Sequence, residues 1–435
     1  MKYISTRKNE EKASFEEAVI NGLSQNGGLY FPESIPQLPV SFFDKIEKIE
    51  DHEIAFRVLK PFVEGSLTEE QLRQVIATTI TFPTPVVEVQ KDIYSLELFH
   101  GPTQAFKDVG ARFMSRCLSH FYRDKKEDVT ILVATSGDTG SAVAHGFFDL
   151  PGVAVTILFP QGKVSTYQEF QMTSLGKNIS VVEVDGTFDD CQKLVKEAFN
   201  DKELRNEMAL SSANSINIAR LLPQMLYYFF AYKQVKSKLG DKGLVVSVPS
   251  GNLGNLTAGL LAKKIGLPID RFISAHNAND TFYQYLSTGA FVKKASVLTY
   301  SNAMDVGNPS NFERIEHLYQ GDITKMKKDV SADRFSDKST VEEIEKCYEK
   351  TGYTLDPHGA VGKLALSKQL KKNEIGVFLE TAHPQKFSKI IVKAIPDYQS
   401  EKVNLEGCSK VNMKNDYADL KKLLTERKSI QLKTR

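Results

Sequence analysis

The sequence predicts an α/β protein built on parallel β-sheets, because buried strands alternate with amphipathic helices through its middle. Several short apolar runs rich in β-branched residues have the composition of strands that are covered on both faces. These runs are Val129–Thr135, Val153–Phe159, Ile179–Val184, Leu244–Val248 and Val377–Leu379. Strands that alternate with helices form parallel sheets with helices on both sides, which is the fold class we expect here.

The helices of this pattern are recognised by apolar residues at helical spacing. The segment 107–122 aligns Val109, Phe113, Cys117 and Phe121 in one i, i+4 column, which makes a wide apolar stripe. The segment 188–199 places Cys191, Leu194, Val195 and Ala198 on one face in the same way. The apolar cluster Met225–Tyr232 is too short to cross a bilayer and predicts a buried helix or an interface.

The length of 435 residues is enough for about two to three domains. Residues 1–90 look more helical and lack a run of buried strands, so we expect an N-terminal segment or cap there. We place a smaller α/β domain at 91–215 and a larger one at 216–435. Residues 321–350 are charged and polar, which predicts a surface linker leading into a helix that Thr340–Glu343 would cap.

Composition excludes several classes of function. Lys and Arg number 56 and Asp and Glu 54, a formal charge of +2 that gives no global field for nucleic acid or an anionic membrane. No apolar run reaches the roughly 18 residues of a membrane span, and Met1–Phe15 lacks the apolar core of a signal peptide. The 4 cysteines are scattered and the histidines follow no metal-binding spacing, so we expect reduced thiols, no metal and a cytoplasmic location.

The strongest local motif is the loop within Ser247–Asn255, where a buried strand runs into a turn rich in glycine and asparagine that opens a helix. Glycines let the backbone approach a ligand, and successive N–H groups at a helix N-terminus favour a phosphate. The alternative is a tight strand-to-helix turn without a ligand. The loop matches neither GxxxxGK[ST] nor GxGxxG, so ATP and NAD are not its natural ligands.

A second loop of this kind, Thr135–Ser141, also joins a buried strand to a helix. Its small hydroxyl residues and helix N–H groups suit a carboxylate, although Ser and Asp also cap helices routinely. Two such loops in one α/β chain point to a ligand with two anionic ends.

Lys107 follows a turn and begins a helix, which is an unusual place for a lysine. The positive end of the helix dipole lowers the pKa of an amine there, which suits a nucleophilic lysine. By position alone, a solvated surface lysine is the more common case.

Several separate motifs carry a resemblance that extends over nearly the whole chain. They are Phe15–Leu23 with Gly27–Pro32, His100–Asp108, Asn214–Asn217 with Arg220, Gly251–Asn255, Met304–Asp305 with Pro309–Arg314, and Thr381–Phe387. With these motifs the chain closely resembles the threonine synthase family of pyridoxal 5'-phosphate (PLP) enzymes of fold type II. The resemblance implies two parallel-sheet domains of that kind with an extra N-terminal segment, and PLP as the cofactor.

The resemblance also implies roles for single residues. Lys107 would bind the cofactor covalently and later move protons, and Thr381 would offer its hydroxyl to the pyridine nitrogen. The cofactor phosphate would be held by Gly251, Asn252, Leu253, Gly254 and Asn255. Asp138 stands where many relatives have an asparagine beside the ring oxygen, and an aspartate there could accept a hydrogen bond rather than donate one. The substrate carboxylate would be held by Ser136, Gly137 and Thr139.

The substrate implied by the family is O-phosphohomoserine, whose phosphate needs cations. Arg220 and Lys163 are the best candidates, with Ser165 and Asn217 as neutral donors. A loop lysine without a ligand is an equal alternative for Lys163. The implied reaction replaces the γ-phosphate by a β-hydroxyl and yields threonine.

Two other readings of the sequence remain open. A related phospholyase or dehydratase would share the early steps and release a ketoacid, and a non-catalytic relative would keep the fold as a binding protein. The long N-terminal segment and the motif around Lys107 favour threonine synthase, and the joint presence of Lys107, the phosphate loop and Thr381 favours an enzyme. The sequence leaves open whether the chain is a monomer or a homodimer.

Overall fold

The computed structural model describes residues 1–7, 12–123 and 128–433, which form two compact units. Unit 1 contains Met1–Met114 and Ser215–Glu401, and unit 2 contains Ser115–Asn214 and Lys402–Arg435. Residues on both sides of the predicted border at 90 belong to the same unit. Residues 1–90 belong to unit 1, the border near 215 coincides with a unit border, and the C-terminal residues join unit 2.

The N-terminal part of unit 1 is mainly helical, as its sequence predicts. Its elements are β1 (Tyr3–Ser5), α1 (Phe15–Asn21), β2 (Tyr30–Pro32), α2 (Val40–Asp44), η1 (Ile46–Lys48), α3 (Asp51–Val63) and α4 (Glu69–Thr79). Strands β1 and β2 pair antiparallel. Capping boxes at Ser14 and Thr68 fix the starts of α1 and α4.

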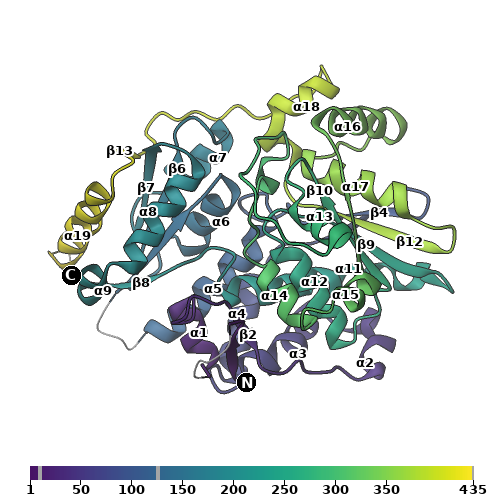
Figure 1. The fold of residues 1–435 in the computed structure, drawn as a ribbon, viewed down its shortest axis with the longest axis horizontal. Coiled ribbons are helices and arrows are strands. Elements are labelled where there is room, and N and C mark those ends of the chain that lie inside the picture. The colour runs from purple at the N-terminus through teal and green to yellow at the C-terminus, as the bar shows by residue number, and fades with distance from the viewer. Residues whose placement is uncertain (8–11, 124–127, 434–435) are drawn as a thin grey trace. The chain divides into compact units, whose positions relative to one another are not determined.

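The centre of unit 1 is a six-stranded sheet among the described residues (Figure 1). The strand order is β11 (Val330–Arg334), β10 (Arg271–His276), β9 (Gly243–Pro249), β12 (Glu374–Glu380), β4 (Ile93–Glu97) and β3 (Val86–Gln90). Every pair is parallel except β3 with β4. This sheet confirms the predicted α/β class with parallel strands, and it takes in two strands that precede Lys107.

Helices cover both faces of this sheet. Ile273 belongs to the apolar core under α16 (Asp337–Thr351), α17 (Pro357–Gln369) and α18 (Ser388–Ala394). The ring of its neighbour Phe272 packs at 5.6 Å against Tyr228 of α11 (Met225–Leu239). Successive side chains of a strand point to opposite faces, so α11 lies on the face opposite α17. Helix α12 (Gly254–Ile265) contacts α11 and β10, and Met225–Tyr232 is fully buried in α11.

The remaining elements of unit 1 connect these layers. They are the first part of α5 (Lys107–Tyr122), then α10 (Ile218–Leu221), η2 (Leu222–Gln224), α13 (Thr281–Thr288), η3 (Asn302–Met304), α14 (Phe312–Leu318), α15 (Ile323–Asp329) and η4 (Pro384–Phe387). The prediction for 321–350 was wrong in two respects. The segment contains strand β11, and α16 is capped by Ser336, so Thr340 lies inside the helix.

Unit 2 has a five-stranded sheet in the described part of the chain, and its helices lie on both faces. The strand order is β13 (Val411–Lys414), β7 (Ile179–Asp185), β6 (Val153–Pro160), β5 (Val129–Ala134) and β8 (Ala209–Ser211), all parallel. Leu158 packs in the core with α8 (Phe188–Asn200) and α19 (Tyr417–Lys433), whereas Ile157 faces α6 (Asp138–Phe147). Helices α7 (Thr166–Thr173) and α9 (Lys202–Glu207) complete the unit.

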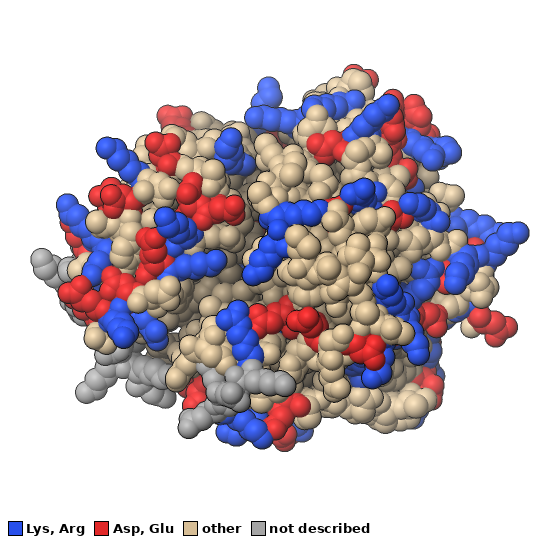
Figure 2. Space-filling view, viewed as in Figure 1, with Lys and Arg blue, Asp and Glu red and all other residues tan. Residues whose placement is uncertain are grey.

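Within residues 1–7, 12–123 and 128–433, no helix combines the length and the apolar character needed to cross a bilayer. On the face drawn in Figure 2, basic and acidic side chains are interspersed over the surface.

Candidate functional site

Lys107 is held in place by backbone hydrogen bonds between its loop and the segment that contains Thr381. Ala105 and Ala382 form an antiparallel bridge. The Phe106 N–H donates to the Thr381 carbonyl oxygen at 2.9 Å, and the His383 N–H donates to the Gln104 carbonyl oxygen at 3.0 Å. Because Thr381 directly follows β12, this bridge places Lys107, the first residue of α5, at the carboxyl edge of the unit 1 sheet.

The residue after Lys107 fixes the shape of the same loop. The Asp108 carboxylate accepts hydrogen bonds from the Thr103 N–H at 2.9 Å and from its hydroxyl at 2.5 Å. Burial raises the pKa of Asp108 to about 6, although the Thr103 hydrogen bonds and the charge of Lys386 lower it. The Tyr227 hydroxyl donates to the Phe106 carbonyl oxygen. The loop is therefore fixed on both sides of Lys107 before any ligand binds, as a positioned nucleophile requires.

The predicted phosphate loop lies at the end of β9, beside β12. Phe378 of β12 is paired with Ser247 of β9, so Thr381 and Gly251 leave the sheet at neighbouring strand ends. Leu253 has a φ of 60°, a left-handed backbone that a leucine adopts at a cost of about 1–3 kcal/mol. Strain of this kind is common where a backbone is shaped to hold a ligand.

The loop has the donors that a phosphate needs. Helix α12 begins at Gly254, and its cap residue Leu253 offers no side-chain acceptor to the first N–H groups. Asn255 is buried, and its Nδ2 has no hydrogen-bond partner among the described residues, although its Oδ1 accepts from the Tyr228 hydroxyl at 2.5 Å. A buried donor without a partner is costly, and an anion at this helix start would satisfy it. These residues therefore fit the phosphate group of PLP.

Arg220 lies next to the start of α5. A Cβ on Gly110 would come within 3.2 Å of Arg220 Nε, so the side chain passes directly over this helix. Arg220 is buried, and burial lowers its pKa to about 10, which the charge of Asp108 partly offsets. It therefore stays charged at neutral pH, beside the first turn of the helix that Lys107 begins.

Asn217 is placed near Arg220, but its side chain has a structural task. It caps α10 by accepting the Ala219 N–H at 3.0 Å, and its Nδ2 donates to the Val19 carbonyl oxygen at 2.9 Å. Asn217 thus ties the N-terminal helix α1 to the segment that carries Arg220.

In unit 2, the loop before α6 has the compact form expected of a ligand-binding turn. The Thr135 hydroxyl accepts the Gly137 N–H at 3.0 Å and the Gly140 N–H at 2.8 Å. Gly137 has a φ of 135°, and a Cβ there would collide with Gln168, so the turn requires glycine. Ser136 and Thr139 are partly exposed on this loop.

Asp138 is held by a hydrogen bond from a neighbouring helix. Its Oδ1 accepts from Gln168 Nε2 at 2.9 Å. Gln168 belongs to the capping box of α7, in which the Ser165 hydroxyl accepts the Gln168 N–H at 3.2 Å. A series of hydrogen bonds therefore connects the start of α7 to the start of α6, running from Ser165 through Gln168 to Asp138. Lys163 is exposed on the preceding turn.

The capping role of Ser165 can be separated from the role in substrate binding that the sequence suggested. We expect Ser165→Ala to lower the free energy of unfolding by about 1 kcal/mol, whereas Ser165→Asp, which also caps a helix, should retain it. If Ser165 also binds the substrate phosphate, Ser165→Asp should raise KM by charge repulsion. Urea unfolding measures the stability and steady-state kinetics measure KM. An unchanged KM in Ser165→Asp would mean that Ser165 caps the helix and does not bind the substrate phosphate.

Several residues of the site were not given a role from the sequence. Gln168 could have been found from the Ser165-x-x-Gln168 capping-box pattern. Asn311 and Arg314 lie in a motif that was recognised, yet no local signal shows that they reach the phosphate loop. Asp356 and His358 form a buried pair in which His358 Nδ1 lies 2.5 Å from the Asp356 carboxylate. His358 Nε2 accepts a hydrogen bond from the N–H of Ala303, a residue beside Gly251.

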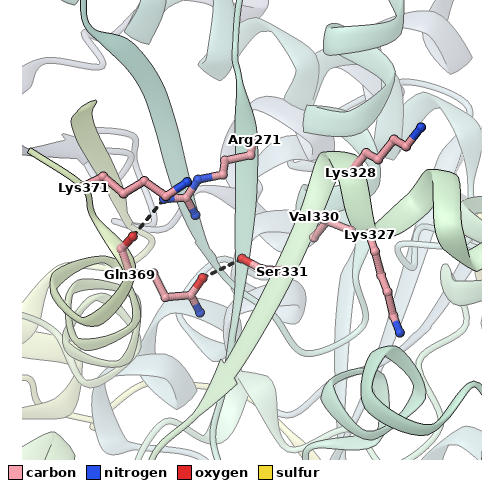
Figure 3. A pocket seen from close by; sticks show the side chains of 7 residues that line it. All are labelled: Arg271, Lys327, Lys328, Val330, Ser331, Gln369 and Lys371. Atoms are coloured by element: carbon pink, nitrogen blue, oxygen red, sulfur yellow. Dashed lines mark hydrogen bonds between the residues drawn. The ribbon is translucent and has the colours of Figure 1, made fainter. Parts of the chain in front are cut away.

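One cavity lies away from all of these residues, at the amino ends of β10 and β11. It has a volume of about 270 Å³ and is lined by Arg271, Lys327, Lys328, Val330, Ser331, Gln369 and Lys371. The side chains of Lys327 and Lys328 point in different directions (Figure 3). Arg271 is paired with Glu374 at 2.7 Å. The cations do not converge on one point, so we assign no ligand to this cavity.

Comparison with known proteins gives matches to two family profiles and to full-length relatives. The family profile described as the threonine synthase N terminus matches residues 2–80, and that of pyridoxal-phosphate-dependent enzymes matches residues 77–379. Threonine synthase of Escherichia coli is 45% identical over 430 residues, which cover 98% of this chain and 99% of that protein. Threonine synthase of Saccharomyces cerevisiae is 35% identical over 494 aligned positions, covering 99% of this chain and 94% of that protein.

Solved structures show the same likeness in three dimensions. The crystal structure of threonine synthase from Escherichia coli matches with a TM-score of 0.90 at 43% identity and covers 98% of this chain and 100% of that chain. PLP-bound threonine synthase from Brucella melitensis matches with a TM-score of 0.90 at 33% identity and covers 97% and 98%.

The fold and the profile match over 77–379 define a PLP-dependent enzyme of fold type II. Within that class, the chain belongs to the threonine synthase family. The predicted family, the predicted PLP cofactor and the predicted lyase class are confirmed by these matches.

Proposed function

We propose that this protein converts O-phospho-L-homoserine and water into L-threonine and phosphate. The observation that carries the proposal is the carboxyl edge of the unit 1 sheet, where Lys107 and Thr381 are joined by the Ala105–Ala382 bridge. The Gly251–Asn255 loop leaves the neighbouring strand at the same edge. A nucleophilic lysine, a hydroxyl and a phosphate loop are the groups that PLP requires.

The residues of unit 1 would hold the cofactor at three points. Lys107 would bind it covalently, the Thr381 hydroxyl would be offered to the pyridine nitrogen, and the loop would receive its phosphate on backbone N–H groups and Asn255 Nδ2. Asp138, held by Gln168, is proposed to lie beside the ring oxygen. When bound, PLP supplies an electron sink for the carbanion chemistry.

The substrate would be held at its two anionic ends. We assign its carboxylate to Ser136, Gly137 and Thr139, whose loop offers hydroxyls and helix N–H groups. We assign its phosphate to Arg220 and Lys163, because the Gly251–Asn255 loop has no cation of its own. Ser165 and Asn217 would support these cations chiefly by capping α7 and α10.

Lys107 is the residue that moves protons in the proposed reaction. Once the substrate amine has taken its place on the cofactor, the free amine of Lys107 would take the proton from Cα. A Cβ proton would then leave and phosphate would depart from Cγ. A proton delivered to Cγ would complete the methyl group, water would add its hydroxyl at Cβ with its proton going to the released phosphate, and a proton would return to Cα. Lys107 would finally displace the product amine and be ready for the next substrate.

The experiment that tests the proposal is to incubate purified protein with O-phosphohomoserine and to measure threonine, 2-oxobutanoate and phosphate together. Threonine and phosphate in equal amounts support the proposal. Production of 2-oxobutanoate instead would identify a phospholyase or dehydratase. No turnover by PLP-loaded protein would favour a binding protein.

Arg220→Ala tests the assignment of the substrate phosphate. Loss of one charge-assisted contact costs on the order of 1.5–3 kcal/mol, so kcat/KM for O-phosphohomoserine should fall by about one to two orders of magnitude. The visible absorbance of the lysine-bound cofactor should stay unchanged. Arg112 provides a matched control on α5, since its guanidinium donates to the Thr78 and Thr79 carbonyl oxygens. Loss of PLP or a normal rate in Arg220→Ala would contradict the assignment.

We also infer a cytoplasmic location, in keeping with the reduced state of the cysteines. Cys117, Cys191, Cys347 and Cys408 are all free thiols, and the first three are buried. A chain without disulfides suits a reducing compartment. Cell fractionation with an enzyme assay would test the location.

A further inference from the structure

Arg314 is the largest fully buried side chain that carries a charge, and its guanidinium is surrounded by oxygen atoms of the backbone and one amide. It is 0% exposed. Nε donates to the Tyr30 carbonyl oxygen at 3.1 Å, Nη2 to that of Ile216 at 2.6 Å and Nη1 to that of Ser215 at 3.4 Å. Nη1 also donates to Asn311 Oδ1 at 2.7 Å.

No carboxylate forms an ion pair with Arg314 within the residues that the structure describes. Its neighbour in sequence, Glu313, is paired with Arg7 at 3.3 Å instead. Burial lowers the pKa of Arg314 to about 9, and the charge of Glu313 partly offsets this, so the group is charged at neutral pH. A buried charge without a counterion is expensive, which calls for an anion close by.

Two of the partners of Arg314, Asn311 and Ser215, also hold the phosphate loop. Asn311 Nδ2 donates to the Asn252 carbonyl oxygen at 3.1 Å, and Asn252 Nδ2 donates to the Ser215 hydroxyl at 2.5 Å. A Cβ on Gly254 would lie 3.4 Å from Asn311 Nδ2. One amide side chain therefore separates the guanidinium from the start of α12.

We propose that Arg314 is a positioning residue for the cofactor phosphate, and that it supplies the positive charge that the Gly251–Asn255 loop lacks. It acts in two ways. It holds Asn311 and Ser215 against Asn252, and its positive charge attracts a dianion at the start of α12 across Asn311, where the dielectric constant is low. The proposal rests on the assignment of this loop to the PLP phosphate.

The proposal predicts a selective loss of affinity for the phosphate of the cofactor. Full-length protein stripped of PLP is titrated with PLP and with pyridoxal, which lacks the phosphate, and both Kd values are measured by absorbance. In Arg314→Gln, the Kd for PLP should rise by roughly tenfold or more, while the Kd for pyridoxal should stay near the wild-type value. Arg314→Lys, which keeps the charge with fewer donors, should lose less.

A second variant keeps the test decisive if Arg314→Gln fails to fold. Asn311→Asp has nearly the same shape and still accepts from Arg314, but its charge neutralises the guanidinium. Asn311→Asp should also weaken the binding of PLP more than the binding of pyridoxal. If both affinities fall equally in folded variants, or neither falls, Arg314 has only a structural role and the proposal is overturned.

The outcome is separate from that of the loop assignment itself. If Gly254→Ala weakens PLP selectively while the Arg314 and Asn311 variants do not, the loop holds the phosphate and only the role of Arg314 fails. If wild-type protein binds pyridoxal as tightly as PLP, the loop assignment fails and the inference fails with it.

Discussion

Lys107→Ala is expected to lower turnover of O-phosphohomoserine by about 10³- to 10⁴-fold, since it removes both the covalent link to PLP and the group that moves protons. The fold should survive, because alanine is a good helix former at the first position of α5. The rate is measured by phosphate release, and binding of PLP by dialysis and absorbance.

Chemical labelling locates the cofactor independently of the rate. Borohydride reduction of wild-type protein followed by peptide mass mapping should place the pyridoxyl group on Lys107. Lys389 on α18 is exposed, so Lys389→Ala provides a control. This variant should be labelled at Lys107 by borohydride reduction and should turn over O-phosphohomoserine at the normal rate. A label on another lysine, or near-normal turnover by Lys107→Ala, would contradict the assignment.

The elements around the site were predictable because their side chains are buried in a regular pattern. Both faces of β5, β6, β7, β9 and β12 are largely covered, so each appears in the sequence as a run of mostly apolar residues. The apolar column that starts after Lys107 matches α5 at Lys107–Tyr122. Local pattern was sufficient for these elements, including the two turns that carry glycine.

Long-range strand pairing was not predictable from local pattern. β4 pairs with β12 although more than 270 positions separate them along the chain, and this pairing brings Lys107 into the same unit as the phosphate loop. β13 pairs with β7 in the same manner and carries the C-terminal helix into unit 2. β11 was missed because its polar residues suit an edge strand, whose exposed side carries no apolar run.

The roles of residues in the site were also predictable only where they depend on a local sequence pattern. Residues that we propose to contact a ligand through a motif, such as Gly251–Asn255, could be named from the sequence. Residues that act through other residues could not, because the contacts of Gln168 with Asp138 and of Arg314 with Asn311 depend on the packing of separate elements. Ser165 and Asn217 were named as ligand donors, and the structure shows that both cap helices.

Two glycines of the phosphate loop differ in what the protein itself requires. A Cβ on Gly251 would lie 2.7 Å from Met304 Cα and 2.8 Å from the Ala303 carbonyl oxygen, both backbone atoms that cannot move alone. Gly251→Ala should therefore cost about 1–3 kcal/mol of stability whether or not PLP is bound. A Cβ on Gly254 meets nothing closer than Asn311 Nδ2 at 3.4 Å, an ordinary contact.

Gly254→Val is therefore expected to fold and to bind PLP weakly, because its side chain would occupy the space that the phosphate needs at the start of α12. Loss of about 3 kcal/mol, the value of one to two charge-assisted hydrogen bonds, corresponds to a rise in Kd of roughly a hundredfold. Gly254→Ala should show a smaller effect in the same direction. In urea unfolding of the apo forms, the free energy of unfolding of both Gly254 variants should be near that of wild type, and that of Gly251→Ala should be well below it. Dialysis against decreasing PLP measures retention, and a folded Gly254→Val that retains PLP as wild type does would show that the phosphate binds elsewhere.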